Sequence, residues 1–321
     1  MVDLIESGFS PYTDARVVVE GLDLADRTAI ITGAGSGIGA ETARALASVG
    51  AEVVMAVRRP AEAEALAAEI TEAGRGSARV EALDLSDLAS VRAFVARWGA
   101  RPLHLLINNA GVMACPLSRT ADGFEMQFGT NHLGHFALAV GLASALERGA
   151  KALGRPSRLV ALSSIGHRRS GIHFDDPHYR KRAYDKWEAY GQSKTANALF
   201  AVGFHARFKD RGITANAVHP GGIMTPLQRH LPREEMIAFG WMDESGKVND
   251  RFKTPAQGAS TSVWAATAAA LEGIGGLYLE DCRQARPFDP AMPFAGVMDH
   301  ARDPKAADRL WAISLDSVGL G

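Results

Sequence analysis

One glycine-rich stretch constrains the fold of this chain more than any other feature. Residues 32–39 read T-G-A-G-S-G-I-G, directly after the apolar run 29–31 and before the helix-forming residues 40–46. A strand that ends in such a turn and continues as a helix directs free backbone N–H groups and the positive end of a helix dipole at one point. The stretch therefore predicts a phosphate-binding turn. Its spacing differs from G-x-G-x-x-G, and a tight turn that binds no ligand is the alternative.

Length, charge and cysteine content exclude several classes of protein. The 321 residues, 47% of them hydrophobic, are enough for one large globular core. The formal net charge of −1 gives no reason to expect nucleic acid or an anionic membrane as a partner. Two cysteines, Cys115 and Cys282, cannot build a disulfide framework. With neither a secretory signal nor a run of about 18 apolar residues, we expect a cytoplasmic protein that has no membrane anchor.

Short apolar runs alternate with helical patterns from residue 28 onward, which is typical of βαβ units. We expect strands at 29–31, 52–57, 79–83, 103–107, 157–163, 213–219 and 276–279, and helices at 40–46, 61–73, 87–98, 123–148, 186–211, 255–269 and 303–315. Ser86 is the expected N-cap of the helix at 87–98, and Asp303 caps the last one. The pattern predicts an α/β fold in which a doubly wound parallel sheet has helices on both faces. Its ligand crevice would lie at the carboxyl ends of the strands.

The chain is predicted to form a single domain with two flanking segments. Residues 1–27 are an N-terminal extension that packs on the domain edge or on a neighbouring subunit, 28–285 form the dinucleotide-binding and catalytic domain, and 286–321 form a C-terminal tail and helix. Residues 223–253 are rich in Met, Phe and Trp and are predicted to be a substrate lid, in which Met224, Leu227 and Trp241 contact an apolar substrate. The alternative is that these side chains complete the core or a subunit contact. Phe288, Met292 and Phe294 are weaker candidates for the same wall.

Tyr190 and Lys194 form the strongest candidate for chemistry. They are four residues apart on a predicted helix, so they share a face, and an ammonium group lowers the pKa of a nearby phenol from its ordinary value of about 10. A coincidental pairing on an exposed face is the alternative. Residues 163–164, 108–111 and 219–221 each follow a predicted strand and would lie at the same rim of the sheet. The segment between residues 164 and 190, with two basic pairs, is expected to be a solvated surface loop.

Taken together, these motifs resemble the short-chain dehydrogenase/reductase family over about residues 28–280. The matching stretches are T-G-A-G-S-G-I-G at 32–39, D-L at 84–85, N-N-A-G at 108–111, T-N-H-L-G-H-F around Asn131, S-S at 163–164, Y-G-Q-S-K at 190–194 and H-P-G-G at 219–222. Residues 171–174 and 190–197 are similar to the retinol dehydrogenase and WW-domain oxidoreductase branch. The resemblance implies a Rossmann-type fold.

The resemblance also implies a catalytic set of four residues. Tyr190 would be the general acid in reduction and the general base in oxidation, and Lys194 would lower its pKa and bind the nicotinamide ribose. Ser164 would hold the substrate oxygen, and Asn131 would position a water for proton relay. The reaction implied is interconversion of a lipophilic secondary or primary alcohol with its ketone or aldehyde. The alternatives are a non-catalytic dinucleotide-binding sensor or scaffold, and an epimerase of the extended branch.

A dinucleotide site follows from the same resemblance. Its residues would be Gly33, Ser36, Gly37, Ile38 and Gly39 at the pyrophosphate, Asp84 and Leu85 at the adenine, Asn109, Ala110 and Gly111 beside the adenosine ribose, and Pro220, Gly221, Ile223 and Thr225 with Tyr190 and Lys194 at the nicotinamide end. The second strand ends at Val57 and is followed by Arg58 and Arg59, where NAD enzymes place an acid. An arginine suits a 2′-phosphate, so NADP is favoured over NAD, although Arg58 can also stack on adenine.

Three further expectations complete the sequence analysis. His132 and His135 are three residues apart on a helix but lack a third ligand nearby, so no metal site is expected. Cys115 is expected to be a small buried thiol rather than a reactive one. By resemblance, the helices at 123–148 and 186–211 would pair subunits in a homodimer or homotetramer.

Overall fold

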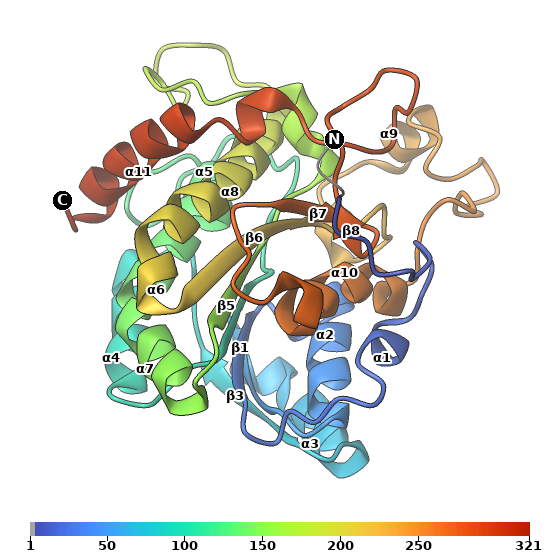
Figure 1. Ribbon diagram of the computed structural model, residues 1–321. Helices are drawn as coiled ribbons and strands as arrows, with labels where there is room; N and C mark the ends of the chain where they lie inside the picture. Colours follow the sequence, from blue (N-terminus) through green and yellow to red (C-terminus); the bar gives the residue numbers. More distant parts are fainter. Residues whose placement is uncertain (1–3) are drawn as a thin grey trace.

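The computed structural model describes residues 4–321, and a single eight-stranded sheet runs through its centre (Figure 1). The strands are β1 (Thr28–Thr32), β2 (Glu52–Val57), β3 (Ser77–Ala82), β4 (Leu105–Asn108), β5 (Ser157–Leu162), β6 (Ile213–His219), β7 (Tyr278–Glu280) and β8 (Arg283–Gln284). Their order is β3-β2-β1-β4-β5-β6-β7-β8, and β8 alone runs antiparallel to its neighbour among these strands. The strand order reverses between β1 and β4, where open α/β sheets bind ligands. The predicted doubly wound sheet is confirmed.

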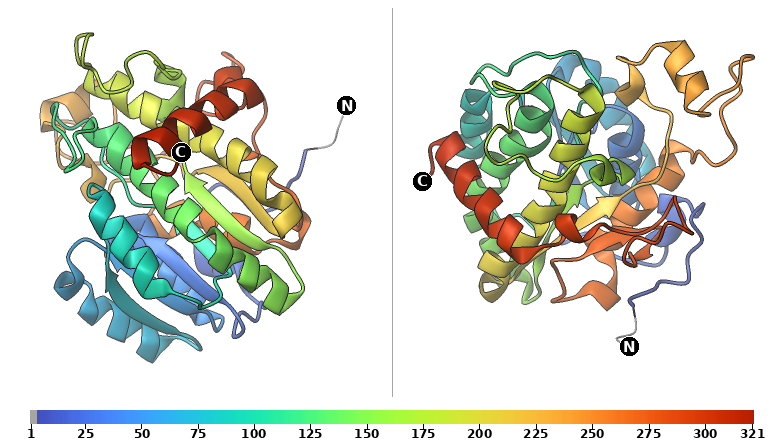
Figure 2. Two further views of the ribbon diagram at one scale, coloured as in Figure 1. Left: turned by 90° about the vertical axis from the view of Figure 1, so that its left-hand side faces the viewer. Right: turned by 90° about the horizontal axis from the view of Figure 1, so that it is seen from above.

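Helices cover both faces of this sheet (Figure 2). The helices are α1 (Ala15–Val18), α2 (Gly37–Ser48), α3 (Glu64–Ala73), α4 (Leu88–Trp98), α5 (Met126–Phe128), α6 (Gly134–Gly141), α7 (Ala143–Leu153), α8 (Lys186–Phe208), α9 (Arg233–Ala238), α10 (Pro255–Thr267) and α11 (Pro304–Val318). One core contains residues of α1, α2, α3 and α10, and the other contains residues of α4, α6, α7, α8 and α11.

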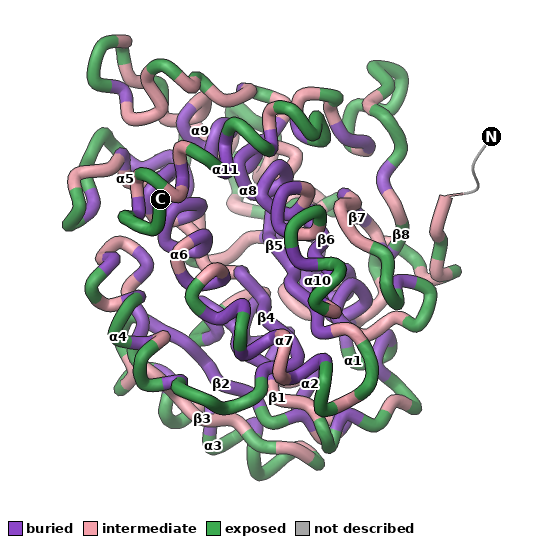
Figure 3. The backbone as a smooth tube through the Cα atoms, turned by 60° about the vertical axis from the view of Figure 1, so that its left-hand side comes forward, coloured by how far each residue is buried: buried purple, intermediate pink, exposed green. Residues whose placement is uncertain are grey.

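The central strands are largely apolar and most of their residues are buried (Figure 3), as expected for strands covered on both faces; Ser157 and Arg158 at the start of β5 are exceptions in composition. Ile30 belongs to the core beneath α8, while its neighbour Ile31 belongs to the core beneath α2. Successive side chains of a strand point to opposite faces, so a run of apolar residues supplies both cores at once. This is why the strand positions were readable from the sequence.

The prediction of one continuous helix over 123–148 is wrong. The chain instead forms α5, a π-helical turn over Gly129–Leu133, α6 and then α7. Its glycines pack tightly, since a Cβ on Gly134 would lie 2.3 Å from the carbonyl oxygen of Leu85. The N-cap of α4 is Asp87 and not Ser86 as predicted. The Asp87 carboxylate accepts a hydrogen bond from the Ala89 N–H, whereas the Ser86 hydroxyl donates to the Asp84 carboxylate.

The flanking segments pack on the domain itself. In the N-terminal extension, α1 lies against α10 and α2, with Ala15, Val18 and Val19 buried. Helix α11 lies along α8 (Figure 1), where the Trp311 ring lies 6.2 Å from that of Phe200, and it also reaches α6, with the same ring 4.8 Å from Phe136. No helix within residues 4–321 combines the length and apolar composition needed to cross a bilayer.

Candidate active site

A cavity of about 1000 Å³ opens at the carboxyl ends of β1, β4, β5 and β6. Of the residues predicted to form the site, it is lined by Gly33, Ser36, Gly37, Ile38, Gly39, Asn109, Ala110, Gly111, Ser164, Tyr190, Lys194, Pro220, Gly221, Ile223, Thr225, Leu227 and Trp241. Side chains from separate segments of the chain therefore meet in one space.

Five predicted site residues lie outside this lining. Arg58 is exposed just beyond β2, Met224 is half-buried, and Leu85 is buried in the core that includes α4. The Asp84 carboxylate accepts hydrogen bonds from the backbone and side chain of Ser86. Asn131 is buried behind the cavity wall.

The start of α2 is built to bind an anion. Its N-cap, Ser36, makes no capping hydrogen bond with its side chain within residues 4–321, whereas Asp87, Asp185 and Asp303 cap their helices. The first N–H groups of α2 therefore remain available where Gly37 and Gly39 line the cavity. Gly33 and Gly37 have φ of +67° and +57°, and a Cβ on Gly37 would lie 3.2 Å from the Thr225 side chain. These features fit a dinucleotide pyrophosphate.

Hydrogen bonds join the N-N-A-G turn at 108–111 to the glycine turn that follows β1. The Thr32 hydroxyl accepts from the N–H groups of Asn109, at 2.9 Å, and Ala110, at 3.0 Å. The Asn109 amide donates in return to the Thr32 carbonyl, at 2.8 Å. His135 Nε2 lies 2.8 Å from the Thr32 hydroxyl, and His132 Nε2 lies 2.8 Å from the Ser314 hydroxyl. Each histidine thus has a hydrogen-bonding partner within the protein.

Tyr190 and Lys194 both project from α8 into the cavity lining. The Lys194 ammonium lies 5.7 Å from the centre of the Tyr190 ring and donates to the Leu162 carbonyl at 3.0 Å. Burial raises the pKa of Tyr190 to about 12, against a hydrogen bond with Ser164 that lowers it. Burial lowers the pKa of Lys194 to about 8. The predicted lowering of the Tyr190 pKa by Lys194 is therefore not the net effect, because desolvation dominates.

Ser164 lies just after β5 and is the N-cap of a short 3-10 helix over Ile165–Arg169. Its hydroxyl accepts from the Gly166 N–H at 3.0 Å, which holds the side chain beside Tyr190. Gly166 lies directly against the tyrosine, since a Cβ there would be 2.8 Å from a ring carbon. Next to it, the Ser163 hydroxyl donates to the Lys194 carbonyl at 2.8 Å and so ties α8 to β5. Backbone contacts thus place the serine and the tyrosine together.

Asn131 lies in the π-helical turn, one layer behind Gly111. Its side chain accepts from the Val112 N–H at 2.8 Å and donates to the Val112 carbonyl at 2.9 Å and the Ser193 hydroxyl at 3.0 Å. A Cβ on Gly111 would lie 3.2 Å from Asn131 Oδ1 and 3.8 Å from Lys194 Nζ. The asparagine therefore holds the wall beside Lys194, and its role in a water relay stays a prediction.

An aromatic wall that the sequence analysis only partly found covers one side of the cavity. The Trp187 ring lies 5.3 Å from Phe239 and 5.9 Å from Trp241, and Trp241 lies 5.9 Å from Phe252. Trp187 was missed, although its place three residues before Tyr190 puts both on one helical face. Its indole N–H donates to Glu235 of α9 at 2.7 Å, which links the lid segment to α8. In the C-terminal tail, the exposed Phe294 also lines the cavity.

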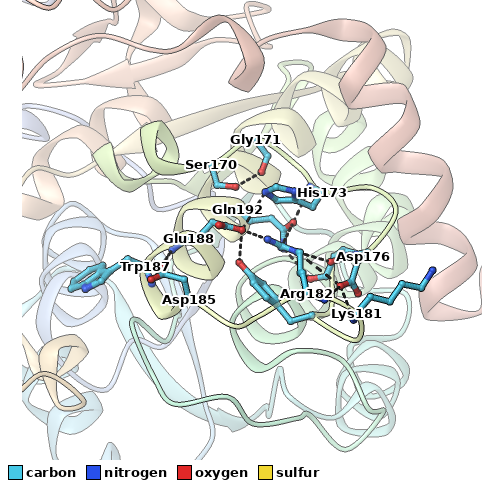
Figure 4. Close-up of polar contacts among 12 residues, drawn as sticks. Ser170, Gly171, His173, Asp176, Lys181, Arg182, Asp185, Trp187, Glu188 and Gln192 are labelled. Carbon is cyan, nitrogen blue, oxygen red and sulfur yellow. Dashed lines mark hydrogen bonds and ion pairs between the residues drawn. The ribbon is translucent and has the colours of Figure 1, made fainter.

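The segment between Ser164 and Tyr190 includes exposed residues such as Lys181, as expected of a surface loop, but specific contacts order it. Asp176 accepts from three consecutive backbone N–H groups, those of residues 180–182, and Arg182 pairs with Glu188 at the start of α8 (Figure 4). Further along, the Gln192 amide donates to the Pro177 carbonyl at 2.9 Å. Burial raises the pKa of Asp176, but the hydrogen bonds from the backbone N–H groups lower it by more, so the pKa is about 2. The carboxylate thus organises the segment that precedes α8.

Replacing Asp176 should destabilise the protein measurably. We expect Asp176→Ala to lower the free energy of unfolding by about 2 kcal/mol, because it removes hydrogen bonds to a charged group. Asp175→Ala is the matched control, since the Asp175 side chain is 98% exposed and pairs with Arg309 alone within the described residues. Because the folded pKa lies below the unfolded value of about 3.9, the difference should persist above pH 4 and shrink toward pH 2. Denaturant unfolding of both variants tests this, and equal stabilities would contradict it.

Comparisons with known proteins agree with this geometry. The short chain dehydrogenase family profile matches residues 27–175. The chain is 50% identical to a Streptomyces lividans protein named "Probable oxidoreductase", over 94% of this chain and all of that protein. It is 41% identical to human retinol dehydrogenase 12, over 93% of this chain and 88% of that protein.

Solved structures are similar as well. A structure of an uncharacterised protein from Mycobacterium paratuberculosis aligns with a TM-score of 0.71 and 34% identity, over 94% of this chain and 97% of that one. A protein from Beutenbergia cavernae, described as an NAD(P)-dependent gluconate 5-dehydrogenase with bound NADP, aligns with a TM-score of 0.63 and 26% identity, over 80% and 96% of the chains. The resemblance found in the motifs is confirmed, and the chain belongs to the short-chain dehydrogenase/reductase family of oxidoreductases.

Proposed function

We propose that this protein is an NADP(H)-dependent reductase of lipophilic ketones or aldehydes that also oxidises the corresponding alcohols. One observation carries the proposal: Tyr190, Lys194 and Ser164 line the same cavity as the uncapped start of α2. A protein that only sensed a dinucleotide would need the glycine turn but not a phenol, an ammonium group and a hydroxyl beside it. Catalysis is therefore favoured over a sensor or scaffold.

The proposed reaction assigns one task to each polar group. Ser164 would bind the substrate oxygen, and the Tyr190 hydroxyl would donate a proton to it. With a pKa of about 12, the phenol is protonated at neutral pH, as reduction requires. Lys194 would hold the ribose next to the reacting ring, and Asn131 would position a water that returns the proton. When bound, the dinucleotide supplies or accepts the hydride.

The cofactor would be held by backbone groups along one side of the cavity. The start of α2, from Ser36 to Gly39, would bind the pyrophosphate, with Gly33 beneath it. The remaining contacts would come from Asn109, Ala110 and Gly111 at the adenosine ribose, Asp84 and Leu85 at the adenine, and Pro220, Gly221, Ile223 and Thr225 at the nicotinamide end.

The substrate would lie against the aromatic wall. Leu227 and Trp241 line the cavity from the segment 223–253, which contains α9 and stands away from the sheet (Figure 1). We propose that this segment is a lid, with Met224 also facing the substrate. Trp187, on α8, belongs to the same wall, with its ring 5.9 Å from that of Trp241. The retinol dehydrogenase relative supports a lipophilic alcohol or aldehyde as substrate.

Turnover with a panel of carbonyl compounds tests the proposed activity. We expect NADPH oxidation at 340 nm with bulky apolar ketones or aldehydes and little with short hydrophilic ones, because the wall is aromatic. Calorimetric titration of NADPH and NADH separately measures cofactor binding without turnover. Tight NADPH binding with no turnover on any carbonyl would instead favour the sensor.

Arg58 should decide the cofactor preference. It follows β2 and is exposed, while Arg59 pairs with Glu62 at 2.7 Å. If Arg58 binds the 2′-phosphate, Arg58→Ala should weaken NADPH binding roughly 10- to 100-fold, because charge-assisted hydrogen bonds are lost, and leave NADH binding unchanged. Arg59→Ala is the matched control. Equal losses for NADPH and NADH would show adenine stacking rather than phosphate recognition.

Assembly and compartment remain proposals. We propose a cytoplasmic homodimer or homotetramer. The helical regions at 123–148 and 186–211 are proposed to pair the subunits, and α11 of the same chain packs along α8, where residues 189–201 are buried. Light scattering of the purified protein would give the assembly mass.

A further inference from the structure

A second cavity, of about 390 Å³, lies at the opposite edge of the sheet from the candidate active site. It is enclosed by the N-terminal extension, the start of β5 and the end of α10. Its lining shares no residue with that of the larger cavity within the part of the chain that the structure describes. Any ligand here would therefore bind outside the proposed catalytic machinery.

Arg158 is the distinctive residue of this cavity. It lies in β5, in register with Leu105 of β4 and Thr214 of β6, and is only 6% exposed. Its Nη1 donates to the Ala265 carbonyl at 3.2 Å, the one side-chain hydrogen bond that it makes within residues 4–321. Within the same residues, no carboxylate lies at ion-pair distance. A guanidinium carries five N–H donors and stays charged, so burying it without a counterion is unfavourable.

The other charged groups around the cavity already have partners. Arg155 Nε lies 3.2 Å from both carboxylate oxygens of Glu272, and the remaining ion pairs are Arg27 with Asp26 at 3.1 Å, Asp23 with Arg75 at 3.7 Å and Glu6 with Arg286 at 3.8 Å. Among the described residues of the lining, Arg158 is the one charge without an ion-pair partner of its own, although Glu272 also acts on it from beyond ion-pair distance. Much of the remaining lining is apolar, from Phe9, Leu24, Leu105 and Trp264.

We propose that this cavity binds a small organic monocarboxylate, whose carboxylate pairs with Arg158 and whose apolar body packs beside Leu105 and Trp264. A planar carboxylate matches the two-pronged donor geometry of a guanidinium. One negative charge balances the one unpaired positive charge, whereas a dianion such as hydrogen phosphate would carry one negative charge more than Arg158 can balance. The volume lies in the range of small-molecule sites.

Calorimetric titration of the full chain at saturating NADPH tests this site apart from the active site. We expect benzoate or hexanoate to bind, and the neutral analogues benzamide and hexanol, or inorganic phosphate, to bind at least tenfold more weakly. Arg158→Met keeps an unbranched side chain of similar length and should weaken benzoate and hexanoate binding at least tenfold, about 1.4 kcal/mol. Arg302→Met, on the surface and paired with Asp299, should keep wild-type affinity.

A second variant covers the case in which Arg158→Met fails to fold. Ala269 lines the cavity from an exposed position, so Ala269→Trp should narrow the cavity while keeping the guanidinium, and should also abolish carboxylate binding. Binding of NADPH to each variant reports an intact fold. The proposal is overturned if the wild type binds neither carboxylate up to about 10 mM, or if the folded variants bind as well as the wild type.

Discussion

Tyr190→Phe should lower kcat for carbonyl reduction by about 10²- to 10⁴-fold, the usual contribution of a positioned acid or base. The substitution removes the one hydroxyl proposed to protonate the substrate oxygen and keeps the ring that packs against Gly166. Affinity for NADPH should fall far less than kcat, because the proposed pyrophosphate contacts at the first turn of α2 are untouched. Steady-state NADPH oxidation and calorimetric titration of NADPH measure the two quantities separately.

Tyr12→Phe is the matched control for this experiment. Tyr12 lines the same cavity, is 48% exposed, and its hydroxyl makes no hydrogen bond within residues 4–321. Its loss should leave kcat unchanged. Equal turnover by Tyr190→Phe and the wild type would remove the catalytic assignment, and with it the preference for an enzyme over a sensor.

Gly166→Ala should lower kcat by about 10²-fold, although it removes no reacting group. The new Cβ would lie 2.8 and 2.9 Å from two carbons of the Tyr190 ring and 3.4 Å from the Ser164 hydroxyl, so the ring must move. A displacement of about 1 Å in the position of a catalytic group can cost this much. NADPH affinity should be kept, and the thermal midpoint should fall only slightly if the tyrosine shifts into the cavity.

Gly171→Ala tests whether the effect comes from that contact. A Cβ on Gly171 would find its nearest neighbour 4.0 Å away, at His300, so this alanine should be tolerated. If kcat falls for Gly166→Ala and not for Gly171→Ala, the loss comes from displacement of the Tyr190 ring and not from replacing any glycine of this segment. A wild-type kcat for Gly166→Ala would mean that the ring position is not limiting.

Local sequence pattern was enough for the sheet and for much of the cavity lining. Strands such as β1 and β5 are buried on both faces, so their apolar runs are visible without any knowledge of the fold. The parallel sheet then brings the segments after β1, β4, β5 and β6 to one edge, because parallel strands share their carboxyl ends. For this reason residues as far apart as Gly33 and Gly221 could be expected at one rim, whereas Thr225 was assigned to the site from the family resemblance.

Contacts between distant segments decided the rest. The π-helical turn that holds Asn131 depends on the close approach of Gly134 to Leu85, and the order before α8 depends on Asp176 binding backbone groups that follow it. The unpaired charge of Arg158 is visible only once its surroundings are known. Side-chain periodicity reports which face of an element is buried, but not which partner covers it, so these features needed the assembled tertiary structure.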